Sequence, residues 1–326
     1  GISSKKDFIF QEMLAHNEMD VDDFVSYINE NYGLLKHSFK SYIFNEFTEY
    51  IADGRIYIDS RDYSNIKNRL KEYLKDEIYL REDFEQIIKR NSTIVEISPF
   101  LVHQLGFRDR GALIIDKKYL SSKDAVISMF LSRKIINEED EKISKTGDFL
   151  SAKYALEKDF RIIKIGENKY LNTSSLISRG FELNKFQSFV EKVEETVNSN
   201  SYFTIKSLLD NGFNHDLIDD GFEQITLDRL LSTSDILKPV TNSYPTLYYK
   251  GDKKFVKDFL LDSLLEYGSV NIEDFTDDIN DRYGLNFDEE KIKHKLKEEG
   301  VFLSKDLNKV YIYKDDYLDE VYGKWI

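Results

Sequence analysis

Two stretches near opposite ends of the chain decide the fold: DFIFQEMLAHNEMDVDDFVSYINENYGL at residues 7–34 and DFLLDSLLEYGSVNIEDFTDDINDRYGL at residues 258–285. They align without gaps, and ten of the 28 positions are identical. Residue frequencies of about 5–7% would give roughly two identities between unrelated stretches of this length. The chain therefore contains a duplicated structural unit, and the rest of the sequence is best interpreted from that unit.

The C-terminal copy predicts three helices followed by a β-hairpin. A first helical stripe is formed by Phe255, Phe259, Leu260, Leu264 and Leu265. The second helix is predicted to begin after the N-cap Asn271 and to end at Tyr283-Gly284, where glycine permits a left-handed backbone. Asp288 is predicted to open a third helix that ends near Gly300, with Ile292 and Leu296 facing inward. Two β-rich runs, 301–303 and 310–313, then flank a polar turn.

The N-terminal copy follows the same plan. Its third helix is predicted to carry Phe39, Ile43, Phe47 and Ile51, and its hairpin lies at 54–59. In the two copies we expect ten core residues: Phe8, Leu14, Phe24, Ile28, Tyr32, Phe259, Leu265, Phe275, Ile279 and Tyr283.

Runs with the character of hairpin strands recur along the whole chain, at 55–59, 112–116, 162–166, 246–250 and 310–313. The first four precede helix-like stretches at 66–74, 125–136, 186–197 and 255–265. We therefore predict a mainly α, α+β chain of five units, each of about three helices and a short β-hairpin: 1–62, 63–120, 121–173, 174–252 and 253–326. Units this small bury little surface alone, so we expect them to pack on their neighbours.

This repeated unit resembles a winged-helix domain of the helix-turn-helix class. The residues that carry the resemblance are 21–28, VDDFVSYI, and 46–56, EFTEYIADGRI. They are similar to the small acidic helix-turn-helix modules attached to bacterial RNA polymerase accessory subunits and to restriction or chromatin proteins. The resemblance implies a tandem array of winged-helix units that binds nucleic acid or serves as an interaction module in transcription or defence.

Composition excludes several other classes of protein. The chain has 326 residues, 41% of them apolar, no cysteine and only 3 prolines. It therefore has no disulfide, no thiolate chemistry and no cysteine-ligated metal. No apolar run approaches the ~18 residues that a membrane span needs. The start at Gly1-Ile2-Ser3-Ser4, without methionine or a signal-like leader, leads us to expect a segment cut from a longer cytoplasmic protein.

Motifs of known chemistry are absent from the sequence. The five histidines have no metal-ligand spacing, and there is no Walker A, GxGxxG or GxSxG pattern. Acidic runs such as 138–141 are typical of a solvated surface. We therefore expect no enzymatic activity, no metal and no cofactor.

The strongest candidate site is the third helix of the C-terminal unit, which concentrates cationic side chains at Lys291, Lys293, His294, Lys295 and Lys297. A helix that contacts duplex DNA needs such side chains on its exposed face. Five acidic residues bracket the cluster, and pairs such as Glu289 with Lys293 would make it an ordinary solubilising surface instead.

The first unit offers a smaller set at the corresponding position: Lys36, His37, Lys40 and, on its hairpin, Arg55. A weaker set, His103, Arg108 and Arg110, lies in the second unit. The net charge of −14 opposes binding to phosphate backbones at long range.

The leading functional hypothesis is duplex DNA binding or transcription-associated regulation. The alternative is a protein–protein interaction module, with RNA polymerase or another protein of a larger complex as partner. A third possibility is an accessory segment of an enzyme whose catalytic domain lies upstream.

Overall fold

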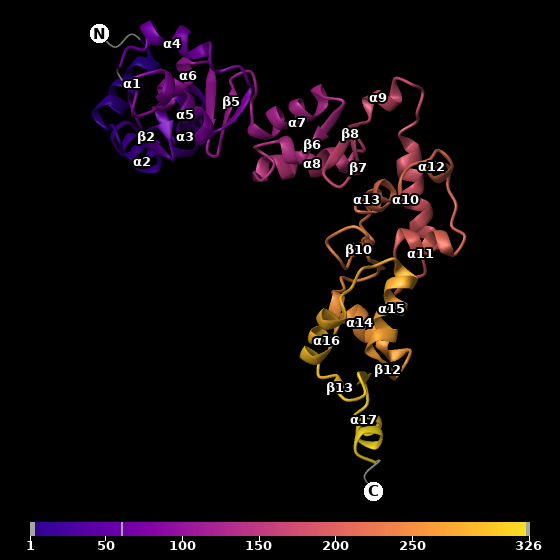
Figure 1. Cartoon of the computed structure of the whole chain (residues 1–326). Helices are drawn as coiled ribbons and strands as arrows, with labels where there is room; N and C mark the ends of the chain where they lie inside the picture. Colours follow the sequence, from indigo (N-terminus) through magenta and orange to yellow (C-terminus); the bar gives the residue numbers. More distant parts are fainter. Residues whose placement is uncertain (1–3, 60, 324–326) are drawn as a thin grey trace. The chain divides into compact units, whose positions relative to one another are not determined.

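The computed structural model describes residues 4–59 and 61–323, so Gly1–Ser3, on which the expectation of a cut N-terminus rests, lie outside the described residues. The predicted fold class is confirmed, because the structure is 51% helical and its strands form small antiparallel sheets (Figure 1). None of the helices in the described part of the chain combines the length and the apolar character needed to cross a bilayer.

The first segment contains three helices and a minimal hairpin. Its elements are α1 (Lys5–Ala15), α2 (Val21–Tyr32), α3 (Lys36–Glu46), the 3-10 turn η1 (Thr48–Tyr50), β1 (Ile51–Ala52) and β2 (Arg55–Ile56). The loop before α2 completes the sheet, since Asp20 forms a β-bridge with Arg55 and the Val21 amide donates to the Gly54 carbonyl at 2.8 Å. The sequence places Ile51 in the third helix, but that helix ends at Glu46 and Ile51 lies in β1.

The next two segments begin with a helix and end with two strands. The second contains α4 (Ser64–Lys71), β3 (Ile78–Leu80), α5 (Arg81–Asn91), α6 (Pro99–Gln104), β4 (Phe107–Arg110) and β5 (Leu113–Asp116). The third contains α7 (Ser122–Ser132), β6 (Ile135–Asn137), the 3-10 turn η2 (Glu138–Asp140), α8 (Gly147–Lys158), β7 (Ile162–Gly166) and β8 (Lys169–Asn172). The helix predicted at 125–136 therefore ends early, and its last residues form a strand instead.

The last two segments repeat the order with additions. The fourth contains α9 (Ser174–Ile177), α10 (Asn184–Thr196), β9 (Tyr202–Phe203), α11 (Ile205–Asp210), α12 (Asp216–Asp219), α13 (Gln224–Leu231), β10 (Leu237–Pro239) and β11 (Tyr248–Lys250). The fifth contains α14 (Val256–Leu265), β12 (Ser269–Asn271), α15 (Ile272–Tyr283), α16 (Glu289–Glu298), β13 (Phe302–Ser304), β14 (Lys309–Tyr311) and α17 (Lys314–Val321).

Segments two to five share one sheet topology that the sequence did not predict. Each sheet has three antiparallel strands, in the orders β3-β5-β4, β6-β8-β7, β9-β11-β10 and β12-β14-β13. In each of these segments the last strand lies at the centre of the sheet. The additional edge strand lies between two of the helices that precede the hairpin. In the fifth segment Val270 pairs with Val310, which pairs on its other side with Leu303.

The described residues form two larger compact units: residues up to 133 with 138–154, and residues 134–137 with those from 155 onward. In the second of these, neighbouring segments share their cores. Phe160 and Ile163 of the third segment lie in one buried cluster with Leu227 and Leu230 of the fourth.

The core expectation is correct for five of the ten residues, partly correct for two and wrong for three. Phe24, Ile28, Phe259, Phe275 and Ile279 are buried, while Phe8 and Tyr283 are partly buried. Leu14, Tyr32 and Leu265 are instead exposed. The inward residues of α1 are Ile9 and Met13, and those of α14 include Leu260 and Leu264.

Candidate functional site

The helix α16 carries the main cluster of candidate residues, and its local sequence explains why it forms. The Asp288 side chain caps it by accepting a hydrogen bond from the Lys291 amide at 3.1 Å. Acidic residues occupy the first turn and lysines the last, as the helix dipole favours. Ile292 and Leu296 are buried, which confirms the predicted inner face and directs the lysines outward.

A groove of about 800 Å³ separates α16 from the β13–β14 hairpin and the following helix α17. One wall is the α16 face that carries Glu290, Lys293, His294 and Lys297. The floor is formed by the half-buried apolar residues of the hairpin, Val301, Phe302 and Leu303. The opposite wall includes Tyr317 of α17, whose ring stacks on Phe302 at 5.6 Å between centroids. The groove is thus apolar at its floor and charged at its rim.

Part of the predicted cationic cluster is neutralised within the helix itself. Lys293 forms ion pairs with Glu289 at 2.6 Å and Glu290 at 2.9 Å, and the hydrogen bonds that it donates to their carboxylates raise its pKa. His294 lies 3.4 Å from Glu298 through its Nδ1 atom. The two contacts of Lys293 are the local charge pairing that the bracketing acids allow.

Four lysines around α16 and the hairpin make no ion pair with any described residue: Lys291, Lys295, Lys297 and Lys305. Lys297 and Lys305 line the groove, whereas Lys291 and Lys295 are exposed and do not line it. The four lysines therefore fall into two sets, one that lines the groove and one on the surface of α16 outside it. Lys305 and the apolar floor were not predicted as part of the site, because they belong to the hairpin and not to the helix that carries the lysine cluster.

Three of the four N-terminal candidates make contacts with neighbouring residues of the first segment. Lys36 donates to the Ser26 hydroxyl at 3.1 Å, and Lys40 forms an ion pair with Asp22 at 2.5 Å. The Arg55 Nε atom donates to the carbonyl oxygen of Glu18 at 3.0 Å, so its side chain holds the loop between α1 and α2. His37 is exposed at the start of α3.

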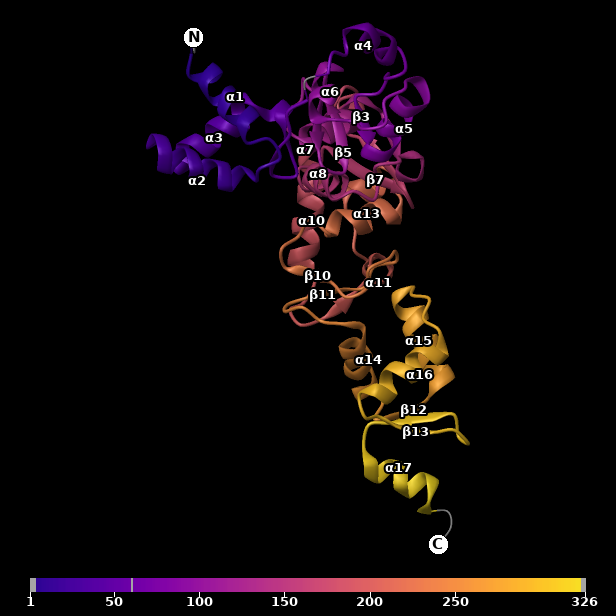
Figure 2. The ribbon, with the colours of Figure 1, turned by 90° about the vertical axis from the view of Figure 1, so that its left-hand side faces the viewer.

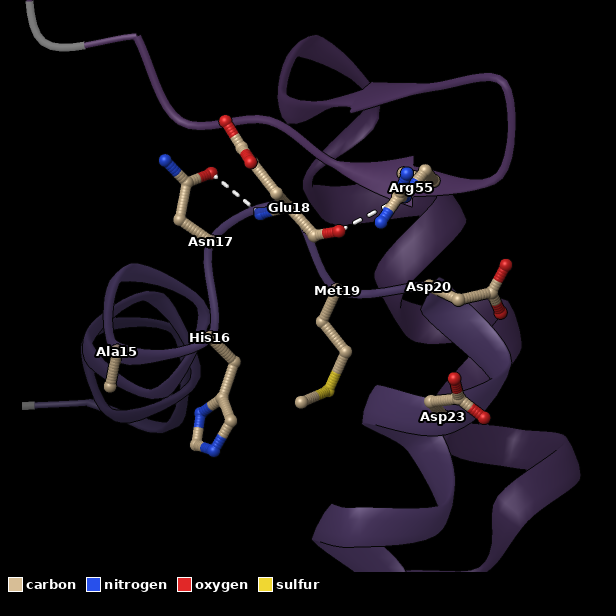
Figure 3. A pocket seen from close by; sticks show the side chains of 8 residues that line it. All are labelled: Ala15, His16, Asn17, Glu18, Met19, Asp20, Asp23 and Arg55. Carbon is tan, nitrogen blue, oxygen red and sulfur yellow. Dashed lines mark hydrogen bonds between the residues drawn. The ribbon is translucent and has the colours of Figure 1, made fainter.

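A hollow of about 630 Å³ adjoins that loop. Figure 3 shows Arg55 directed to Glu18 across it, with Asp20 at the N-cap of the neighbouring helix α2 and Asp23 in its first turn. Its carboxylates and His16 do not form a metal site. Across residues 4–59 and 61–323, no group of three or more side chains of the metal-binding types is placed to hold an ion.

The weaker set in the second segment lines a small hollow of about 180 Å³ together with Phe44 and Ile51. Burial lowers the pKa of His103 there, which favours its neutral form. Arg110 donates to the Leu120 carbonyl at 3.2 Å and Arg108 is partly buried, so these residues serve local packing.

No family model matches the sequence, and no curated protein resembles it at a significant level.

Proposed function

We propose that the chain is a non-enzymatic array of five winged-helix units whose C-terminal unit binds another protein. The repeated order of helix, strand, helices and a two-stranded hairpin supports the winged-helix assignment. Attachment to transcription or defence machinery in the cytoplasm rests on the resemblance of residues 21–28 and 46–56.

The observation that carries the interaction proposal is the groove beside α16. A volume of about 800 Å³ with an apolar floor is large enough for several side chains of a partner. Covering exposed apolar surface is the main favourable contribution to protein association. The groove therefore suits a protein surface better than a sugar–phosphate backbone, which offers little apolar surface for that floor.

Duplex DNA is the second candidate, favoured by the unpaired Lys291, Lys295 and Lys297 on one helix. The net charge of the C-terminal unit argues against duplex DNA as the first candidate. Residues 253–326 hold 12 Lys and Arg against 18 Asp and Glu, so the unit repels phosphates at long range.

The test is site-specific photo-crosslinking of the full chain in cells of its natural host. A photoreactive residue replaces Leu303 in the groove, and a matched control carries it at the exposed Asp277 of α15. We expect an adduct at position 303 that protease removes and nuclease does not, with no such adduct at position 277. A nuclease-sensitive adduct would favour DNA, and equal adducts at both positions would reject the groove as the site.

A further inference from the structure

In one segment of the chain, the helix that precedes the hairpin is covered by an element of the neighbouring segment. In the fourth segment this helix is α13, which β10 and β11 follow, just as β13 and β14 follow α16. The strand β7 of the third segment packs against α13, and Figures 1 and 2 show the two elements side by side in both views. Ile163 of β7 is buried in the cluster that contains Leu227 and Leu230 of α13, and the partly buried Ile165 packs against it.

An acidic side chain fixes this covered face electrostatically. Glu157, at the end of α8, accepts two hydrogen bonds from the guanidinium of Arg229 on α13, each 2.7 Å long. The Glu157 residue is only 6% exposed. A bidentate pair of this kind supplies both energy and orientation. The cover on α13 thus combines apolar side chains with a carboxylate that meets a cation of the covered helix.

In the fifth segment the groove beside α16 is bounded on its far side by α17, and no described residue of another segment lines it. The fourth segment packs on other elements of the fifth: Tyr202 donates to Asp262 of α14 at 2.6 Å, and Thr204 donates to the Tyr283 carbonyl at 2.7 Å. Beside α16 the floor stays open, with Lys297 and Lys305 at its rim.

We propose that the groove between α16 and the β13–β14 hairpin binds an acidic, amphipathic segment of a partner protein. Its apolar side chains lie on Val301, Phe302 and Leu303, and its carboxylates pair with Lys297 and Lys305. The inference rests on the proposed function and specifies the partner's chemistry.

Charge density separates this partner from nucleic acid. Duplex DNA presents one negative charge per ~1.7 Å of its axis, all of it repelled by the net acidic unit. A short acidic segment carries few carboxylates, and charges farther away than the Debye length of about 8 Å are largely screened at physiological salt. Burial of its apolar side chains then adds a contribution that DNA lacks.

The experiment measures binding of three fluorescent synthetic peptides to the full chain by anisotropy. The first peptide alternates leucine and phenylalanine with glutamate, the second replaces each glutamate by lysine, and the third replaces each apolar residue by serine. We expect saturable binding of the first peptide and at least about tenfold weaker binding of the other two, since each lacks one of the two contributions.

Two double variants of the protein locate the binding. Lys297→Glu with Lys305→Glu changes the groove rim, and Lys291→Glu with Lys295→Glu makes the same charge change at residues that do not line the groove. The rim variant should bind the acidic amphipathic peptide at least about tenfold more weakly, and the control variant less than about threefold more weakly. Circular dichroism and the thermal transition of each variant show that both remain folded.

Several results would overturn the inference. Equal losses in both variants would mean general charge attraction, and equal binding of the serine peptide would mean that the floor is not used. Self-association of the wild-type chain that the rim variant abolishes would assign the groove to a second copy. A protein adduct at position 303 without binding of the acidic amphipathic peptide would leave the proposed function standing and reject only this partner chemistry.

Discussion

Replacing Phe275 by alanine tests how much burial of this side chain in the core of the C-terminal unit stabilises the helix α15. Phe275 is fully buried, and its ring meets Tyr267 edge to face at 5.7 Å between centroids. Removing a buried phenylalanine side chain costs about 3–5 kcal/mol, because transfer free energy is lost and a cavity remains. The aromatic contact accounts for about 0.5–1.5 kcal/mol of that total.

The matched control is Leu265→Ala in the preceding helix, since Leu265 is 57% exposed. Surface substitutions of this kind usually change the free energy of unfolding by less than about 0.5 kcal/mol. Several segments share cores, so a single unfolding transition is not assured. Native-state hydrogen exchange of the α15 and α16 amides measures the local free energy of opening instead. A loss below about 1 kcal/mol for Phe275→Ala, or equal losses for both variants, would refute the burial described above.

Three further outcomes are expected. Glu157→Ala leaves Arg229 without its partner and should lower the opening free energy of α13 by about 3 kcal/mol, as measured by hydrogen exchange of the α13 amides. This value is near the lower limit for buried pairs because the Arg229 side chain is 36% exposed. Burial raises the pKa of Asp228 to about 6, so its contribution to stability is complete below about pH 4 and is lost as the pH rises through 6. In denaturation experiments at a series of pH values, Asp228→Asn should make the free energy of unfolding depend less on pH across that interval. If duplex DNA binds at α16, changing both Lys291 and Lys295 to Glu should reduce the log–log salt slope by up to about 1.8, and an unchanged slope in a salt titration on random duplex would exclude those contacts.

Signals that act within a few residues were predictable from the sequence. The Asn271 side chain caps α15 by accepting from the Glu273 amide at 2.9 Å, and Gly284 ends that helix at φ 65°. The pair of Glu289 with Lys293 also forms as its spacing predicts. Each of these features depends on the chain immediately around it, so local chemistry suffices to locate it.

The edge of the buried face of the first helix could not be obtained in this way. In α14 the apolar pairs Leu260 with Leu264 and Leu261 with Leu265 have the same i, i+4 spacing and lie on adjacent stripes. Both satisfy a helical pattern, and only the elements packed against the helix decide which stripe faces inward. The structure buries the first pair and leaves Leu265 exposed.

The third strand in each of the four three-stranded sheets was missed for a related reason. β12 is three residues long, Ser269–Asn271, and it is fixed by pairing with Lys309–Tyr311, which lie about forty positions later in the chain. A strand of that length has too little alternation to be recognised by pattern. Its stability comes from the partner strand, so the sequence around it carries little signal.

The candidate site shows the same division between local and long-range information. The lysines of α16 are evident in the sequence, but their chemical setting depends on residues from three other places: Ile272, the hairpin 301–309 and Tyr317. These residues place an apolar floor beside Lys297 and leave Lys291 and Lys295 outside it. A cationic helix considered alone indicates DNA, whereas the same helix beside an apolar floor favours a protein partner. The hypothesis changed because the fold added a surface that no segment of the chain contains by itself.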